Sequence, residues 1–221
     1  MASSLHPTAR TGFTPLAGAA WYKRLHARLL ACGSRRYTSA VEDHKRMLFG
    51  SLGGRVLEIG PGPGTNLPYF RADAEWIGVE PNPFMLDYIE RAARELGRTV
   101  DVRTGSAEYL PFPTASVDAV ACSLVLCTVH DVAAALREVR RVLRPGGTFA
   151  FIEHVAAPRG TALRATQRVA SPVWRALADG CHPDRETWAA IQDAGFARVE
   201  MVHFRAPLPV VGPHVAGLAI R

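Results

Sequence analysis

A glycine-rich loop and a more distant glutamate are the residues of this sequence best suited to bind a cofactor. The loop, Gly60-Pro61-Gly62-Pro63-Gly64, directly follows an apolar run at 56–59 that is typical of a strand. Glycines at the end of a strand allow the backbone to approach a ligand closely. Glu80 lies 20 residues after Gly60, an offset at which a carboxylate accepts hydrogen bonds from ribose hydroxyls. The pattern predicts a nucleotide-like cofactor. A tight strand-to-helix turn with a helix-capping acid is the alternative.

The spacing of the glycines disfavours a nicotinamide oxidoreductase. A dinucleotide fingerprint, G-x-G-x-x-G, places a helix N-terminus against pyrophosphate, whereas here the third glycine comes one position early. Glu58 and Glu108 would add negative charge around the loop, which suits a cationic sulfonium better than a pyrophosphate. The alternatives are that Glu58 caps a neighbouring backbone group and that Glu108 is solvated.

Candidate catalytic and acceptor-binding residues occur later in the chain. His154 ends a predicted strand, where a neutral imidazole could accept a proton from an acceptor; a structural histidine is the alternative. Glu153 alternates with His154 across the sheet, so only one of the two is expected to face the site. Asp179, Cys181 and His182 form a polar cluster that either lines an acceptor pocket or only forms a turn.

The cysteines do not suggest a metal site. Cys32, Cys122, Cys127 and Cys181 include no C-x-x-C pair, and no histidine stands at zinc-finger spacing. Cys122 and Cys127 are interpreted as small buried apolar residues. The sequence therefore predicts free thiols, without disulfides or metal.

The elements that position these residues follow from the hydropathy pattern. From residue 55, short apolar runs alternate with amphipathic stretches, which predicts βαβ units and a mostly parallel sheet. Strands are predicted at 56–59, 75–80, 99–103, 117–123, 148–154, 196–204 and 214–220, and helices at 84–96, 131–143, 161–178 and 185–194. The link 205–213 is too short for a helical crossover, so the last two strands should be antiparallel. The expected fold is a Rossmann-like, doubly wound α/β domain with a seven-stranded sheet.

Composition and charge exclude several classes of protein. The chain has 221 residues, 48% of them hydrophobic and 21% charged, and a net charge of +6, as expected of one globular domain with an extension. No apolar run approaches the roughly 20 residues of a spanning helix, and the N-terminus lacks a signal-peptide pattern. The expected location is cytoplasmic. Nucleic acid is not an expected partner, because the basic residues are few and no recognition motif accompanies them.

Several stretches resemble the successive motifs of class I S-adenosylmethionine-dependent methyltransferases, namely residues 56–64, Glu80, 105–108 and 143–147. Within that family, residues 122–127, 137–139, 151–156 and 179–181 look most like the membrane-associated alkyl-thiol methyltransferases. The resemblance spans residues 55–221. It implies S-adenosylmethionine as cofactor, S-adenosylhomocysteine as product and a small-molecule acceptor, with a thiol favoured. Those relatives begin with an apolar anchor, whereas this chain begins with a polar tail and a basic helix.

The resemblance also implies roles for individual residues. The glycine loop would hold the methionine part of the cofactor, Glu80 the ribose, and Ala107 with Glu108 the adenine edge. The predicted cofactor-binding set is Glu58, Gly60, Gly62, Gly64, Asn66, Glu80, Pro81, Ala107, Glu108, Cys122 and Ser123. The candidate catalytic residues are His154 and Asp179, and the candidate acceptor pocket is Trp21, Tyr22, Cys181 and His182. One alternative is methylation of an oxygen, nitrogen or carbon atom in a metabolite or phospholipid. The other is a noncatalytic cofactor-binding or interaction protein.

Residues 1–50 are expected to form a helical cap before a methyltransferase domain at 51–221. Helices are predicted at 16–30 and 39–49, separated by Gly33-Ser34-Arg35-Arg36. The segment carries eight lysines and arginines against two acidic residues. Its first helix is interpreted as a lid over the site, a helix docked on the core, or a helix lying on an anionic membrane. The lid is favoured, because methyl transfer requires that water be excluded.

Overall fold

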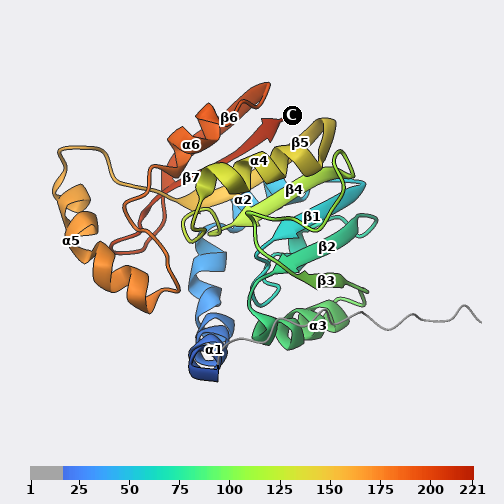
Figure 1. The fold of residues 1–221 in the computed structure, drawn as a ribbon, viewed down its shortest axis with the longest axis horizontal. Coiled ribbons are helices and arrows are strands. Elements are labelled where there is room, and N and C mark those ends of the chain that lie inside the picture. Colours follow the sequence, from blue (N-terminus) through green and yellow to red (C-terminus); the bar gives the residue numbers. More distant parts are fainter. Residues whose placement is uncertain (1–16) are drawn as a thin grey trace, which may run out of the picture.

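A seven-stranded sheet with the order β3-β2-β1-β4-β5-β7-β6 forms the centre of the computed structural model (Figure 1). The structure describes residues 17–221; the polar segment 1–16, in which no signal peptide is expected, lies outside the described residues. The strands are β1 (Arg55–Ile59), β2 (Glu75–Glu80), β3 (Asp101–Thr104), β4 (Val117–Ser123), β5 (Leu143–His154), β6 (Arg198–Arg205) and β7 (Pro213–Ile220). Strands β1 to β5 pair in parallel, and β7 is antiparallel to both neighbours. The predicted Rossmann-like fold is confirmed.

Helices flank this sheet, and their ends agree with local sequence signals. They are α3 (Leu86–Glu95), α4 (Val132–Val142), α5 (Ala162–Leu177) and α6 (Thr187–Asp193), with 3-10 turns η1 (Leu67–Tyr69) and η2 (Pro83–Met85). The Asp131 side chain caps α4 by accepting a hydrogen bond from the Ala134 amide at 2.9 Å. Gly97 and Gly195, at φ +64° and +77°, follow α3 and α6 in the left-handed conformation that ends helices.

Alternate residues of the central strands pack on opposite faces of the sheet. Leu57 of β1 packs in one hydrophobic cluster with Leu136 of α4. Val56, its neighbour in sequence, packs in a second cluster with Ile89 of α3. Because both faces are covered, the functional groups have to lie at the strand ends, as is usual in open α/β sheets.

The N-terminal helices differ from the prediction. A continuous helix α1 (Ala17–Ala40) runs through Gly33, and α2 (Glu42–Phe49) follows it, so the predicted interruption at 33–36 is wrong. A glycine inside a helix costs only about 1 kcal/mol relative to alanine, which is too little to break a helix that has no proline there. Phe49 of α2 is buried in the same cluster as Val56, whereas α1 extends away from the sheet (Figure 1).

Strand β5 begins five residues earlier than predicted, at Leu143. Leu143 already pairs with Val117, and the register shifts between Val117 and Ala119. Residues 144–147, which the prediction leaves between a helix and a strand, are therefore an irregularity within the strand, with Gly146 at φ +76°. Among the described residues, no helix is both long enough and apolar enough to cross a membrane.

Candidate active site

The glycine loop lies at the carboxyl end of β1, and its first two glycines both have a positive φ, +60° and +56°. A Cβ atom on Gly60 would come within 2.7 Å of Val125 Cγ2, so packing against the segment after β4 requires a glycine. A Cβ on Gly62 would meet no atom within 4 Å, but the residue has φ +56°. The backbone of Gly62 thus adopts a conformation that favours glycine and borders open space. This is the property that close approach of a ligand requires.

Glu80, the last residue of β2, is joined to this loop. Its carboxylate accepts hydrogen bonds from the Gly62 amide at 3.0 Å and the Asn82 amide at 2.9 Å. The side chain is 6% exposed, and burial raises the pKa of Glu80 to about 7 against the effect of these two bonds. The sequence offset thus correctly placed Glu80 beside the loop, and its bond to a ribose stays a prediction.

Glu58 lies within β1, and its partners are side chains. Asn66 Nδ2 donates to its carboxylate at 2.7 Å and Trp76 Nε1 donates at 2.9 Å. Burial raises the pKa of Glu58 to about 7. The sequence analysis did not predict the contact of Glu58 with Trp76. The two residues are 18 positions apart, and no sequence pattern indicates a hydrogen bond between them. Glu58 and Asn66 are therefore held together in the interior, beside the start of the glycine loop.

Glu108 joins the loop after β3 to the start of α4. Its carboxylate accepts hydrogen bonds from the His130 amide at 2.8 Å and the Asp131 amide at 3.4 Å. Ala107, beside it, is 4% exposed and belongs to the core. Because it accepts these two hydrogen bonds, the Glu108 carboxylate is not merely solvated. It adds negative charge at the N-terminus of α4. Contact of either residue with an adenine edge stays a prediction.

The end of β4 and the segment after it are organised by Glu153. Its buried carboxylate accepts hydrogen bonds from the amides of Val125, Leu126 and Cys127 at 2.8–3.2 Å. Cys122 is buried, and its Sγ lies 3.5 Å from Glu153 Oε1. Glu153 therefore fixes the backbone of residues 125–127 by accepting hydrogen bonds from their amides.

Two further predicted cofactor contacts lie at strand ends. Ser123 is the last residue of β4 and is partly exposed, and Pro81 is exposed directly after β2. Both positions are compatible with a ligand at the carboxyl edge of the sheet. Neither contact is tested by the structure.

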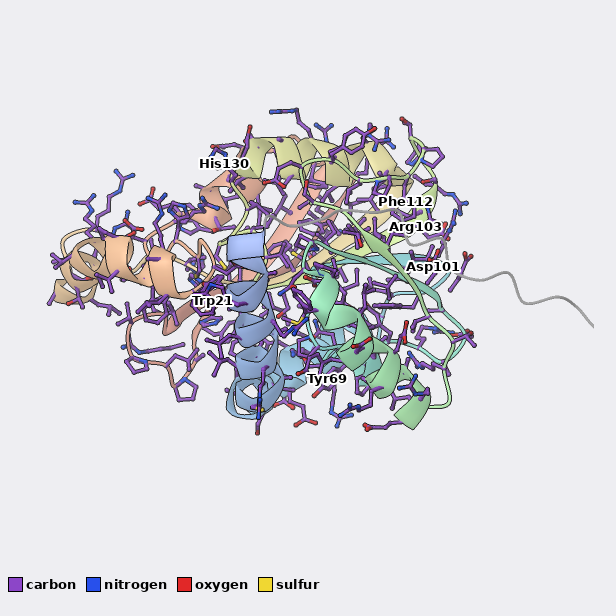
Figure 2. The ribbon with its side chains drawn as sticks, turned by 60° about the horizontal axis from the view of Figure 1, so that its bottom comes forward. Trp21, Tyr69, Asp101, Arg103, Phe112 and His130 are labelled. Carbon is purple, nitrogen blue, oxygen red and sulfur yellow. The ribbon has the colours of Figure 1, made fainter. Side chains whose placement is uncertain are left out.

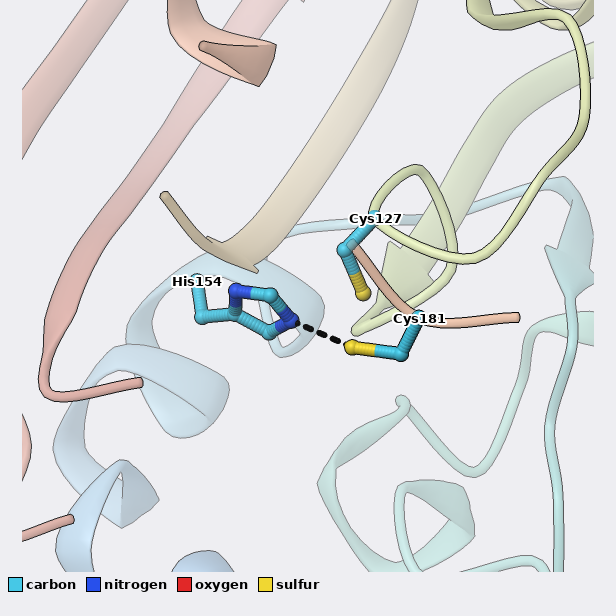
Figure 3. Close-up of side chains that lie close together, drawn as sticks. All are labelled: Cys127, His154 and Cys181. Carbon is cyan, nitrogen blue, oxygen red and sulfur yellow. Dashed lines mark hydrogen bonds between the residues drawn. The ribbon is translucent and has the colours of Figure 1, made fainter. Parts of the chain in front are cut away.

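His154 ends β5, as predicted, and its ring meets two sulfur atoms (Figure 3). Its Nε2 lies 2.9 Å from Cys181 Sγ, and the Cys127 sulfur completes a group in which all three atoms lie within 4.8 Å of one another. Hydrogen bonds from Cys127 and His154 hold the pKa of Cys181 well below its usual range. The sequence missed this group, because its members are far apart in the chain.

Asp179 and the N-terminal helix are joined by polar contacts. Lys23 Nζ lies 2.8 and 2.7 Å from the two carboxylate oxygens of Asp179, and the Asp179 amide donates to Tyr22 Oη at 3.1 Å. Asn82 Nδ2 donates to the Lys23 carbonyl at 3.0 Å. Helix α1 thus bridges the segment after β2 and the segment after α5, which places it beside Glu80.

Trp21 and His182, also predicted for the acceptor pocket, do not share one position in the structure. Trp21 is 65% exposed and projects from α1 on the side nearer α5 (Figure 2). The His182 amide donates to the Cys127 carbonyl at 2.9 Å, so this residue fixes the segment that carries Cys127. A cavity of about 680 Å³, bordered by Trp188 and His203, contains none of the predicted site residues.

Comparisons with known proteins decide the family. A methyltransferase-domain family model matches residues 57–151. The human thiol S-methyltransferase TMT1A is 36% identical over 198 residues, which cover 84% of this chain and 81% of that protein. The chain belongs to the class I S-adenosylmethionine-dependent methyltransferases. Human thiol S-methyltransferase TMT1B is 34% identical over 206 residues, 87% of this chain and 84% of that protein. A methyltransferase from Aquifex aeolicus shares the fold, with a TM-score of 0.63, 19% identity, and coverage of 89% of this chain and 97% of that one.

This methyltransferase uses S-adenosylmethionine to methylate a small molecule. When bound, the cofactor supplies a methyl group on a positively charged sulfur. The carboxyl edge of the sheet fits such a group, because Gly62 borders open space and Glu80 lies directly beside it. The protein's own part in methyl transfer is to align acceptor and methyl roughly 3–3.5 Å apart and to exclude water.

Proposed function

We propose that this methyltransferase transfers the methyl group to the sulfur of a small-molecule thiol. The observation that carries the proposal is the similarity to TMT1A and TMT1B, which covers 84–87% of the chain. The family model ends at residue 151. The similarity to the thiol S-methyltransferases is therefore too long to be explained by the matched methyltransferase domain alone, and it includes other parts of the chain.

The reaction is a displacement at carbon, in which the thiolate sulfur bonds to the methyl carbon. The bond from that carbon to the sulfonium breaks, and its electron pair stays on the departing sulfur, which becomes a neutral thioether. The thiol proton has to pass to solvent or to a base before the attack, because the thiolate is the reactive form. His154 Nε2 already lies 2.9 Å from Cys181 Sγ, so the imidazole is shared with a protein thiol.

The proposed cofactor contacts are those at the ends of β1, β2 and β3. Gly62 borders the methionine part, Glu80 accepts hydrogen bonds from the ribose, and Ala107 with Glu108 borders the adenine. Helix α1 serves as the lid. Its contacts with Asp179 and Asn82 support this role, because they attach the helix to the segment after α5 and to the segment after β2, where Glu80 lies.

The experiment that tests the acceptor is a screen of the purified protein against small aliphatic thiols, aryl thiols, phenols and amines. Products are identified by mass spectrometry, with S-adenosylhomocysteine release measured in parallel. We expect thioethers from the thiol group only. O-, N- or C-methylated products would replace the thiol proposal with the corresponding alternative, and cofactor binding without turnover on any acceptor would favour a noncatalytic binding protein. Cell fractionation would test the cytoplasmic location that we also propose.

A further inference from the structure

The sulfur atoms of Cys127 and Cys181 and the imidazole of His154 come from three separate parts of the fold. Cys127 lies after β4, His154 ends β5 and Cys181 follows α5. Figure 3 shows the two sulfur atoms on the same side of the His154 ring. All three residues are buried, and Cys181 retains the largest exposed fraction, 8%. The group therefore lies in the interior at the carboxyl edge of the sheet, and Cys181 is its member nearest to solvent.

Hydrogen bonds to the backbone hold the segments that carry Cys127 and Cys181 in place. The His182 amide donates to the Cys127 carbonyl at 2.9 Å, which ties the two cysteine-bearing segments together. Arg185 donates to the carbonyls of Leu126 and Val129, both at 2.7 Å. The cluster is thus built on a fixed backbone, as preorganised ligand sites are.

The chemistry and the spacing of the three atoms suit zinc. Two thiolates and an imidazole are ligands that Zn²⁺ prefers, and a catalytic zinc site has three protein ligands and one open position. With Zn–S about 2.3 Å and Zn–N about 2.0–2.1 Å, tetrahedral ligands lie roughly 3.5–3.8 Å from one another. The three atoms lie within 4.8 Å of one another, and Nε2 of His154 is 2.9 Å from Cys181 Sγ. Shifts of less than about an ångström, available to side-chain rotation, would produce that geometry.

A second histidine supports the orientation of the His154 ring. His214 Nδ1 lies 2.9 Å from the Gly212 carbonyl, so this nitrogen carries the proton, and Nε2 of a neutral ring is an acceptor. His214 Nε2 and His154 Nδ1 are both buried without a protein partner. The centroids of the two rings lie 6.3 Å apart. A hydrogen bond between them, direct or through one water, would place the proton of His154 on Nδ1. Nε2 would then be free to ligate, which is the usual arrangement of a metal-bound histidine.

We propose that Cys127, His154 and Cys181 bind one Zn²⁺, whose fourth position takes the thiolate of the acceptor. The second half of this proposal rests on the proposed thiol acceptor. Coordination releases the thiol proton to solvent and keeps the sulfur as a thiolate. The zinc-bound sulfur then attacks the methyl carbon, the carbon–sulfonium bond breaks with its electron pair on the departing sulfur, and the neutral thioether product leaves the metal. No oxidant or reductant is needed.

The direct test measures zinc in the reduced, purified protein by inductively coupled plasma mass spectrometry, after incubation with Zn²⁺ and gel filtration. We expect about one zinc per chain, and at least a tenfold lower content in C127S, H154N and C181S. The matched controls are C32S, which removes an exposed thiol, and C122S, which removes a buried one outside the cluster; both should retain zinc. Absence of zinc from the wild-type protein, or retention of zinc by the three cluster variants, overturns the proposal.

A second measurement does not depend on how the variants fold. Cobalt replaces zinc in such sites and gives intense thiolate-to-metal absorption together with the visible bands of a tetrahedral ion. We expect the wild-type protein with Co²⁺ to show both, and a small thiol acceptor to shift them. An octahedral spectrum without thiolate bands contradicts the site.

The outcomes separate the metal site from the proposed function. If zinc binds but no thiol is methylated in the acceptor screen, the site stands and the thiol acceptor is wrong. If zinc-free protein, prepared with a chelator, methylates thiols at an unchanged rate, the thiol acceptor stands and ligation of the acceptor by zinc is wrong.

Discussion

Replacing Glu80 with alanine should weaken S-adenosylmethionine binding while leaving the protein folded. The side chain lies at the end of β2, 6% exposed, and its carboxylate already accepts two backbone hydrogen bonds that fix Gly62 and Asn82. A hydrogen bond to a charged group contributes about 1.5–3 kcal/mol, which corresponds to a roughly 10- to 150-fold rise in the dissociation constant. Burial of the carboxylate, expressed in its raised pKa, offsets part of what the two bonds contribute to stability.

Calorimetric titration of the wild-type and variant proteins with the cofactor at one pH measures this effect. The matched control is Glu75→Ala at the other end of the same strand, where the carboxylate is 65% exposed and pairs with Arg55 at 3.1 Å. That variant makes the same chemical change at the opposite edge of the sheet, so its affinity should stay at the wild-type value. An unchanged dissociation constant in folded Glu80→Ala, or equal losses in both variants, would show that Glu80 does not contact the cofactor.

Three further changes test the loop, the lid and the buried carboxyls. Gly62→Val should abolish cofactor binding in a calorimetric titration. Its side chain meets no protein atom but enters the space assigned to the ligand, and valine is locally strained at φ +56°. Circular dichroism should show that the rest of the fold is kept, and normal binding would remove the loop from the site. Lys23→Ala should lower turnover several-fold while cofactor affinity stays constant, because the ion pair of Lys23 with Asp179 attaches α1. Steady-state kinetics compare this variant with Arg28→Ala, which changes an exposed residue of the same helix. Equal turnover in the two variants would contradict the lid. Burial raises the pKa of Glu58 and Glu80 from 4.5 to about 7, so the folded protein without cofactor holds more of these protons than the unfolded chain between those pH values. The contribution of these two carboxyls to the free energy of unfolding therefore falls as pH rises through that window. Urea titrations should show a lower free energy of unfolding at pH 8 than at pH 5, with a smaller difference in Glu80→Ala. An equal or larger difference in that variant would refute the raised pKa of Glu80.

Local sequence signals were sufficient for most of the secondary structure. Asp131 caps α4 and glycines follow α3 and α6, because these features depend on a few neighbouring residues. The N-terminal helices were not predicted correctly, since a lone glycine in an exposed helix is a weak signal. The domain boundary at residue 50 stays a prediction, but Phe49 is buried in the same hydrophobic cluster as Val56 of β1. A truncation that tests the lid should therefore stop before α2.

The sequence by itself determined the order of strands and helices, the glycine loop and the pairing of that loop with Glu80, because a parallel sheet brings its carboxyl ends to one edge whatever the details of packing. Only the tertiary structure decided which distant side chains meet there. Trp76 contacts Glu58 across neighbouring strands, and Lys23 contacts Asp179 across most of the chain. Cys127, His154 and Cys181 converge from the segment after β4, the end of β5 and the segment after α5. These contacts depend on side-chain direction and on loop paths set by packing, which no periodicity in the chain records.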